Sequence, residues 1–371
     1  MQWIDAYNKY NHNIFRQLTH IHRHMHQALN DRLVHIGYRR FRMSFIDVIP
    51  YLDPEGIRLT DLVVLHKTPK ATLARLINSI HHQGFIDKKA DPTDSRANIL
   101  FITPKGVELV EKASNMANEI TNELSDLMGK QAFDQFCEVV QQCFNLSSLP
   151  YPPVYQYLQD DANQGGHGQL WMQLNSVVKY IDLRLFENNK ANGYDDLQNS
   201  HRRVLEHISQ HGTRASVIAG KEGLTKQSIS DIGHVLLQKK YLKSVKDPKD
   251  KRAHLLVYAE KGKAMLISAM IELEIIEAEL NRNLGDECYQ LLSLQSERLW
   301  FLLDGQNPDP ICSDDFSRLK TIVKPLLQTL LSEIQQNHTE LMARAFTKNG
   351  ENYQIEQALI RFIQTQNIPM K

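Results

Sequence analysis

The sequence has 371 residues, of which 42% are hydrophobic and 23% are charged, and its 43 basic residues balance 43 acidic ones. This length predicts two or three domains, and the composition is typical of a globular protein in water. No apolar run approaches the ~20 residues needed to span a bilayer, and no basic segment followed by an apolar core marks a signal peptide. We therefore expect a cytoplasmic protein with no membrane partner.

Helical patterns dominate the first part of the chain. Apolar residues at spacings of three and four predict a long helix over residues 9–35, which Gly37 interrupts. Two further helices are expected over 41–52 and 59–66, the second of them short. The short helix and the one that follows it together form a helix-turn-helix.

The next helix has clear start and stop signals. Thr68 is expected to be its N-cap and Pro69 its first helical residue. The helix is predicted over 70–83, with an apolar stripe along one side. Gly84 is expected to close it, because glycine readily takes the left-handed conformation found after a helix end.

Two strand-like runs come next, at 85–86 and 98–103, with a polar turn between them. Asp-Pro opens this turn, since an Asp side chain can bond its own backbone two residues on. The pattern predicts a β-hairpin. Two more helices are expected over 105–127 and 130–146, before a stretch rich in Pro and Gly at 147–168.

The same plan returns 156 residues later. The hairpin turn reads DPTDSRA at 91–97 and DPKDKRA at 247–253. Between 37–106 and 193–262, 15 of 70 ungapped positions are identical, and apolar positions stay apolar. The pattern predicts an internal duplication, with repeats at 1–146 and 169–305, a linker at 147–168 and a helical extension at 306–371.

Charge is segregated along the chain. Residues 56–106 carry eight Lys and Arg against four acidic residues, and residues 212–262 carry eleven against five. The balancing acids lie elsewhere, for instance at Glu272 and Glu274. A DNA-facing surface on an otherwise acidic body requires such segregation.

A hairpin that directly follows a helix-turn-helix is a wing, and at this point the sequence resembles the MarR family of winged-helix transcription regulators. Those proteins carry an Asp-x-Arg in the wing, matched here at 94–96 and 250–252. The resemblance covers about residues 9–305, in a tandem, fused form. It implies a mostly α fold with small β-wings, in which two winged helix-turn-helix repeats sit on a shared helical body, and a helical C-terminal extension follows.

The helix at 70–83 and its counterpart in the second repeat, which begins near Lys226, are the candidates for reading DNA, because a helix fits the major groove and reads base edges with its N-terminal residues. Arg75 can contact a guanine edge or a phosphate, and Gln227 can pair with adenine. Asp231 replaces Arg75 in the second repeat; it repels phosphate but can accept from a cytosine amino group. The two helices are therefore not expected to read the same sequence, although an ordinary solvated helix face is the alternative. The candidates are Lys70, Thr72, Arg75 and Asn78 in the first repeat and Lys226, Gln227, Ser228 and Asp231 in the second.

In the MarR family the wing arginine enters the minor groove and the Asp before it holds the hairpin. The resemblance implies the first role for Arg96 and Arg252, with Lys251 beside the latter, and the second role for Asp94 and Asp250. A narrow A·T minor groove attracts arginine, which agrees with this interpretation. The alternative is a surface Asp–Arg ion pair that only fixes the hairpin, worth about 0–1 kcal/mol.

In MarR proteins the terminal helices join two chains into a dimer that binds an operator. This chain holds both halves, so we expect a single-chain pseudo-dimer on double-stranded DNA. A true homodimer with four winged helices, joined through residues 313–365, is the rival. Family members commonly respond to small, often aromatic, ligands bound between the helical body and the winged helix, so the resemblance also implies such an effector.

Four alternating histidines, His20, His22, His24 and His26, make a metal site an alternative. On a helix, histidines four residues apart can bind zinc. The two such pairs point about 160° apart, so they cannot form one site. A solvated or interface helix rich in His is the simpler interpretation.

Cys137 and Cys143 lie six apart on a predicted helix, a spacing that does not favour a disulfide, and we expect buried, reduced thiols. No phosphate loop, nucleophile elbow or zinc-enzyme signature is present, so we predict no enzyme activity and no cofactor. The function expected is that of a sequence-specific DNA-binding regulator, a repressor released by a small effector. The alternatives are a protein-interaction scaffold built on winged helices and a metal-dependent regulator that uses the histidine run.

Overall fold

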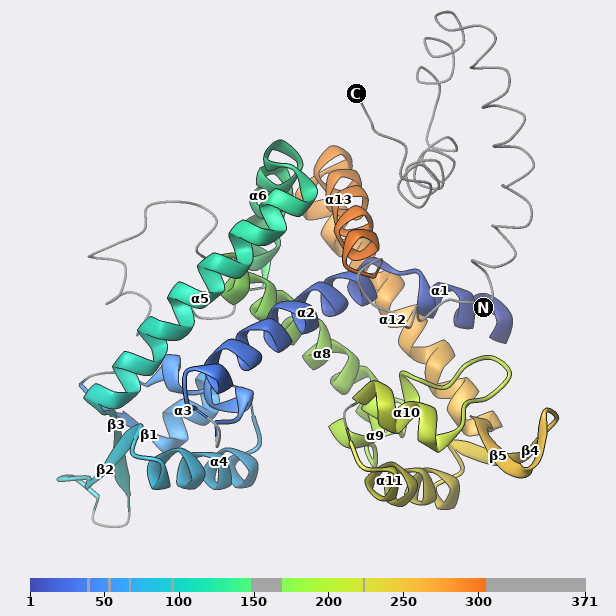
Figure 1. The fold of residues 1–371 in the computed structure, drawn as a ribbon, viewed down its shortest axis with the longest axis horizontal. Coiled ribbons are helices and arrows are strands. Elements are labelled where there is room, and N and C mark those ends of the chain that lie inside the picture. The colour runs from blue at the N-terminus through green and yellow to red at the C-terminus, as the bar shows by residue number, and fades with distance from the viewer. Residues whose placement is uncertain are drawn as a thin grey trace, which may run out of the picture. The chain divides into compact units, whose positions relative to one another are not determined.

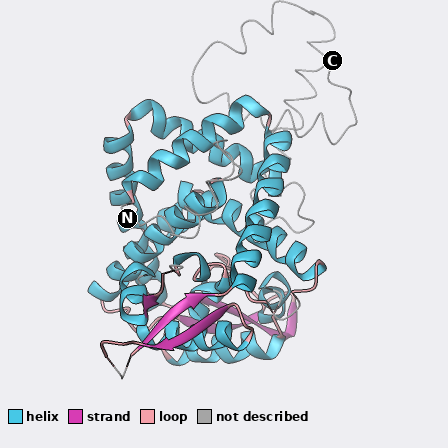
Figure 2. Ribbon diagram, turned by 90° about the vertical axis from the view of Figure 1, so that its left-hand side faces the viewer, coloured by secondary structure: helices cyan, strands magenta, loops and turns pink. Residues whose placement is uncertain are grey.

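The computed structural model describes residues 1–38, 41–52, 55–66, 68–94, 97–147, 169–222 and 224–304. Helices make up most of these residues, accompanied by two small antiparallel sheets (Figures 1 and 2). Residues 1–303 form one compact unit. None of the described helices is long and apolar enough to cross a membrane. Nearly all of the predicted linker at 147–168, and all of the predicted extension at 306–371, lie outside the described residues.

Two helices, α1 (Trp3–Asn11) and α2 (Ile14–His35), stand where the sequence predicts one long helix. Asn13 separates them. Its side-chain oxygen accepts a hydrogen bond from the backbone N–H of Arg16 (2.8 Å), and its amide group donates to the carbonyl oxygen of Lys9 (3.0 Å). Asn is a favoured N-cap because it satisfies an N–H that the helix itself leaves unpaired. The prediction of a single helix is therefore wrong at this point.

The predicted helix over 41–52 is also wrong. The structure has two short 3₁₀ turns instead, η1 (Met43–Phe45) and η2 (Ile49–Tyr51). Pro50 lacks an N–H and cannot donate the backbone hydrogen bond that a continuing helix needs.

Helices α3 (Leu59–His66) and α4 (Lys70–His82) form the predicted helix-turn-helix. The start of α4 differs from the prediction, because Pro69 rather than Thr68 stands at its N-cap. The carbonyl of Pro69 accepts the first helical hydrogen bonds, while the hydroxyl of Thr68 bonds the ring of His66 (2.7 Å).

A three-stranded antiparallel sheet accompanies these helices, in the order β1 (Ile57–Arg58), β3 (Asn98–Ile102), β2 (Ile86–Ala90). β2 and β3 form the predicted hairpin, with Ile86 opposite Ile102. β1 is a strand that the sequence pattern does not reveal. The long helices that follow are α5 (Pro104–Met128) and α6 (Lys130–Leu146).

The second part of the chain has matching elements in the same order. Shifted by 156 residues, α2, α3, α4 and α5 coincide end to end with α8, α10, α11 and α12. The α9 helix differs from its counterpart because Glu206 has the backbone N–H that Pro50 lacks, and donates it to a carbonyl in the preceding turn (2.9 Å). The bounds are α8 (Leu170–Ala191), α9 (Asn199–Leu205), α10 (Ala215–Glu222), α11 (Lys226–Gln238), β4 (Leu242–Asp247), β5 (Asp250–Tyr258), α12 (Glu260–Leu284) and α13 (Asp286–Asp304).

Close packing explains why a glycine follows each hairpin. A Cβ atom on Gly106 would lie 2.3 Å from the carbonyl oxygen of Phe85, and one on Gly262 would lie 2.1 Å from that of Tyr241. No side chain fits at such distances. Only glycine lets the first turn of α5 or α12 press against the start of its hairpin.

The turn after each helix-turn-helix has the same left-handed backbone conformation in both parts of the chain. Gly84 has φ 78°, as expected for a glycine that ends a helix. Lys240 stands at the equivalent place with φ 62°, although a lysine rarely adopts this conformation. The same turn is therefore made by two different residues.

Helices of both parts of the chain build one helical body. α2 packs against α5 and α8, α6 packs against α8, and α1 packs against α12. Lys9 Nζ lies 2.6 Å from Glu274 Oε1, and Arg23 Nη2 lies 2.7 Å from Glu206 Oε2. The buried apolar side chains form a single core. Within this unit, α4 and α11 lie at the same end as their hairpins (Figures 1 and 2).

Candidate nucleic-acid interface

We call residues 57–102 the first winged unit and residues 213–258 the second. In the first unit, α4 buries Leu73, Ile77 and Ile80. The opposite side carries the four residues predicted to read DNA, all of them exposed: Lys70, Thr72, Arg75 and Asn78.

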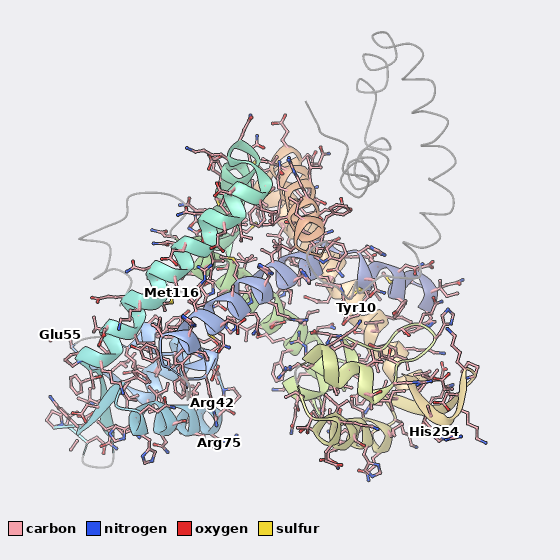
Figure 3. The ribbon with its side chains drawn as sticks, in the orientation of Figure 1. Tyr10, Arg42, Glu55, Arg75, Met116 and His254 are labelled. Carbon is pink, nitrogen blue, oxygen red and sulfur yellow. The ribbon has the colours of Figure 1, made fainter. Side chains whose placement is uncertain are left out.

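Two of these side chains make hydrogen bonds within the first winged unit and still have donor groups left open. Arg75, labelled in Figure 3, donates from Nε to the carbonyl oxygen of Ala71 in its own helix (3.4 Å), and its Nη groups remain open among the described residues. The Oδ1 atom of Asn78 accepts a hydrogen bond from Nζ of Lys88. The amide NH₂ of Asn78 is left to donate.

In the second unit, Lys226, Gln227, Ser228 and Asp231 are likewise exposed on α11. Gln227 Nε2 donates to Asp231 Oδ1 (2.8 Å), so these two side chains act together. Ser228 belongs to the helix cap: its backbone N–H donates to Thr225 Oγ1 (3.1 Å), and the two hydroxyl groups bond each other (2.8 Å). Ser228 is therefore less available to DNA than the sequence suggests.

The first Asp of the hairpin motif holds the first wing. Asp91 is buried, and its Oδ1 accepts hydrogen bonds from the backbone N–H and the hydroxyl of Thr93 (2.8 Å each). Nε of Arg58 lies 2.5 Å from Asp91 Oδ2. These hydrogen bonds, those from Thr93 above all, lower the pKa of Asp91 to about 2.

The second wing repeats this arrangement. Asp247 is buried, accepts from the backbone N–H of Lys249 (2.8 Å), and pairs with Arg214 through Nε (2.6 Å) and Nη2 (2.5 Å). The bond from Lys249 and then that from Arg214 hold the pKa of Asp247 below its usual value. Arg58 and Arg214 stand at equivalent positions, and so do Asp91 and Asp247.

The sequence-based prediction did not include the ion pair between this arginine and the first Asp of the motif in either repeat, although the repeat contains a signal for it. Arg58 and Arg214 are identical between the repeats and lie two residues after the matched Gly56 and Gly212. Nothing in the local pattern links either arginine to an aspartate 33 residues away.

The predicted wing residues are placed only in part. Arg96 lies outside the described residues, as does the side chain of Lys251. Arg252 is exposed and has no side-chain partner among the described residues. Asp250 accepts from the backbone N–H of Arg252 (3.1 Å) and lies 3.7 Å from Nη1 of Arg214, so it adds to the hold on the turn. For Asp94, the backbone carbonyl accepts from the N–H of Ala97 (2.9 Å).

The second hairpin is strongly basic. Lys243, Lys246, Lys249, Arg252 and His254 all have exposed side chains on β4, β5 or the turn between them; Figure 3 labels His254. Clustered cations of this kind neutralise phosphate groups and release the counterions of DNA.

A histidine cluster connects the first winged unit with the helical body. His66 of α3 bonds the backbone carbonyl of Asp47 through Nε2 (2.8 Å), and His26 of α2 approaches Asp47 Oδ1 (3.8 Å). His26 also stacks on Trp171 of α8, and its ring centroid lies 5.2 Å from that of His22. Burial, in each case the largest cause, lowers the pKa values of His22 and His66 to about 4.

The corresponding place in the second part of the chain carries different side chains, without the two histidines of α2. Val178 and Asp182 stand where the first part has His22 and His26. Arg202 pairs with Asp182 (2.6 Å). An arginine–carboxylate pair between α9 and α8 therefore stands where the first part has the His22–His26 pair.

Neither the histidines nor the cysteines form a metal site in the part of the chain that the structure describes, because no three His, Cys, Asp or Glu side chains come close enough together. Cys137 and Cys143 are buried as expected. Burial raises the pKa of both thiols to about 12, which keeps them protonated and unreactive.

Two helix-turn-helix units, each followed by a hairpin, define a winged-helix protein. No protein-family model matches the chain. The transcriptional regulator HosA of Escherichia coli O111:H- is 23% identical over 93 residues, which cover 25% of this chain and 69% of HosA.

Solved structures of regulators are similar as well. CouR from Rhodococcus jostii RHA1, bound to p-coumaroyl-CoA, is 18% identical with a TM-score of 0.29 and covers 37% of this chain and 96% of its own. CouR bound to a 23-mer DNA duplex is 24% identical with a TM-score of 0.26, covering 36% and 98%. NMB1585, a MarR family regulator from Neisseria meningitidis, is 20% identical with a TM-score of 0.22, covering 43% and 98%. Each of these structures aligns with less than half of this chain.

Proposed function

We propose that this chain is a sequence-specific DNA-binding transcription regulator, a repressor, which carries two winged units in one polypeptide and acts as a pseudo-dimer. The main support is that α2, α3, α4 and α5 recur end to end, 156 residues later, within a single compact unit. A dimeric regulator needs two chains to bring two such units to one operator. Here one chain supplies both.

Contacts within the chain support the pseudo-dimer. Helix α1 packs on α12, and the pairs Lys9–Glu274 and Arg23–Glu206 join residues that are 265 and 183 positions apart. The core is continuous between the two parts. Contacts of this kind replace the interface that two separate chains would form.

The docking we propose follows from the exposed faces of α4 and α11. Each helix enters a major groove, and the two grooves lie one helical turn, about 10 base pairs, apart. The hairpins reach the flanking minor grooves with Arg96 and Arg252, whose charge suits a narrow A·T groove. The basic residues of the second hairpin add contacts to phosphate.

Release by a small aromatic effector is part of the proposal. A ligand bound between the helical body and a winged unit would favour one arrangement of the two units and so shift the population that binds DNA. The different chemistry of the two junctions means that such a ligand would act on one unit at a time.

The test is to measure mass and affinity with one duplex that carries a selected site. Light scattering of the complex should give one chain per duplex, and affinity should fall steeply with salt, since each neutralised phosphate contributes about −0.9 to the log–log slope. Two chains per duplex would overturn the pseudo-dimer while leaving the DNA-binding function intact. A flat salt dependence would count against DNA binding itself.

One observation favours a second candidate function, a protein-interaction scaffold. Ile271 and Ile275 of α12 are 44% and 46% exposed, whereas the first part carries Asn115 and Glu119 at these positions. Exposed apolar residues one turn apart are typical of a surface that binds another helix. The flat salt dependence described above would support this candidate.

A further inference from the structure

The two recognition helices offer opposite hydrogen-bonding groups to a base. On α4, Arg75 has donors only, and the oxygen of Asn78 is occupied by Lys88. On α11, one N–H of the Gln227 amide donates to Asp231 Oδ1 (2.8 Å). At the position equivalent to Arg75, α11 therefore presents a carboxylate, which has acceptors only.

This contrast lies at equivalent positions. Asp231 is 156 residues after Arg75, and the intervening shift also aligns the ends of α4 with those of α11. All three side chains, Arg75, Gln227 and Asp231, are exposed. Two helices that dock in the same way would therefore place a donor and an acceptor at corresponding base pairs.

A donor and an acceptor suit different base edges in the major groove. Guanine presents two acceptors, N7 and O6, which suit Arg75. Cytosine presents the donor N4–H₂, while adenine presents the donor N6–H₂ next to the acceptor N7. Adenine N7 would repel the carboxylate of Asp231, so cytosine suits this side chain better.

We propose that Asp231, held in place by its hydrogen bond from Gln227, is the acceptor that selects cytosine in the second half-site, where Arg75 selects guanine in the first. This inference rests on the proposed function, which it deepens by naming the base that each winged unit prefers. The operator then departs from a perfect inverted repeat at this position. The two units of a homodimer could not make that distinction, because their residues are identical.

The experiment is in vitro selection of random duplexes by the full-length protein and its variants. The wild type should enrich a site with guanine in one half and cytosine at the corresponding position of the other. Asp231→Ala should lower the preference for cytosine roughly tenfold, the size expected for one good base contact. Asp231→Arg should replace cytosine by guanine and turn the selected site into an inverted repeat.

Gln227→Ala should weaken the same preference, and Ser230→Ala, an exposed neighbour on α11, is the matched control that should leave it unchanged. An unchanged site with Asp231→Ala and Asp231→Arg, or a palindromic site with the wild type, would overturn the inference while the DNA-binding function stands. If the wild type enriches no duplex at all, the proposed function itself falls.

Discussion

Arg58 Nε lies 2.5 Å from Oδ2 of Asp91, a residue 33 positions later, and Arg214 meets Asp247 in the same way. Each pair ties the strand-like segment before the helix-turn-helix to the turn of the hairpin. The carboxylates are buried and also accept hydrogen bonds from the backbone of the turn. The shape of each wing therefore depends on one arginine outside it.

The wing should loosen more when the first Asp of the motif is changed than when the second is. Asp91→Asn removes the ion pair with Arg58 and weakens the bonds from Thr93, so we expect faster amide hydrogen exchange in β2 and β3 and weaker operator binding. Asp94→Asn is the matched variant in the same turn, with a smaller expected effect. Equal effects of the two variants would show that Asp94 holds the turn as firmly as Asp91 does.

The wing arginines should contribute to affinity without contributing to the fold. Arg252→Ala removes a side chain that is exposed and has no partner among the described residues. We expect weaker binding to the operator, a salt slope that is smaller by about one, and an unchanged unfolding temperature. The same result is expected for Arg96→Ala.

Salt-controlled gel shifts of the two arginine variants test this, with Ser244→Ala, an exposed and uncharged position on the second hairpin, as the control. Unchanged affinity at low salt would mean that the arginines lie away from DNA.

The glycine that follows each hairpin should not tolerate a side chain. A Cβ on Gly106 or Gly262 would meet a backbone carbonyl at 2.3 or 2.1 Å, so alanine forces the helix away from the hairpin. The expected cost is about 1–3 kcal/mol of unfolding free energy. Urea denaturation of each variant measures it.

Gly220 provides the control, because a Cβ there meets nothing within 4 Å. Gly220→Ala lies inside α10 and should raise stability by roughly 0.5–1 kcal/mol, through the higher helix propensity of alanine. Loss of stability in all three variants would show that close packing at Gly106 and Gly262 is not the cause.

Acidification should loosen the first winged unit before the second. The pKa values of His22 and His66, about 4 in the folded protein, lie below the ordinary value of about 6.5. The unfolded chain therefore takes up protons first. The folding stability that the neutral histidines contribute is lost as the pH falls from about 6.5 to 4. Burial tends to raise the pKa of Asp47, but the neighbouring imidazole of His26 and other nearby charges lower it overall, so this carboxylate acts in the same direction.

Hydrogen exchange at pH 7 and pH 5 can locate this loss. Protection of α3 and α4 should fall more than protection of α10 and α11, because Val178 and the Asp182–Arg202 pair stand where the first part has His22 and His26. His22→Val introduces the residue found at the equivalent position, and His66→Gln is a second variant; both should reduce the pH dependence. A uniform loss over both winged units would rule out the histidine cluster as its origin.

The sequence by itself determined the elements whose signals are local and repeated. The spacing of apolar residues located α3 and α4 and predicted which side of α4 and α11 faces water. The motif at 91–97 and 247–253 located both hairpins. Burial periodicity and turn chemistry act over a few residues, so they can be recognised without knowing the fold.

Only the tertiary structure decided two kinds of feature. In some, one local signal overrides another, and in others, residues that are distant in the sequence come into contact. Asn13 caps α2 and divides a continuous helical pattern, and Pro50 reduces a predicted helix to two short turns. The pairing of Arg58 with Asp91, the stacking of His26 on Trp171 and the glycine contacts at Phe85 and Tyr241 depend on strands and helices that meet after folding. Their physical reason is proximity in space, which periodicity along the chain does not encode.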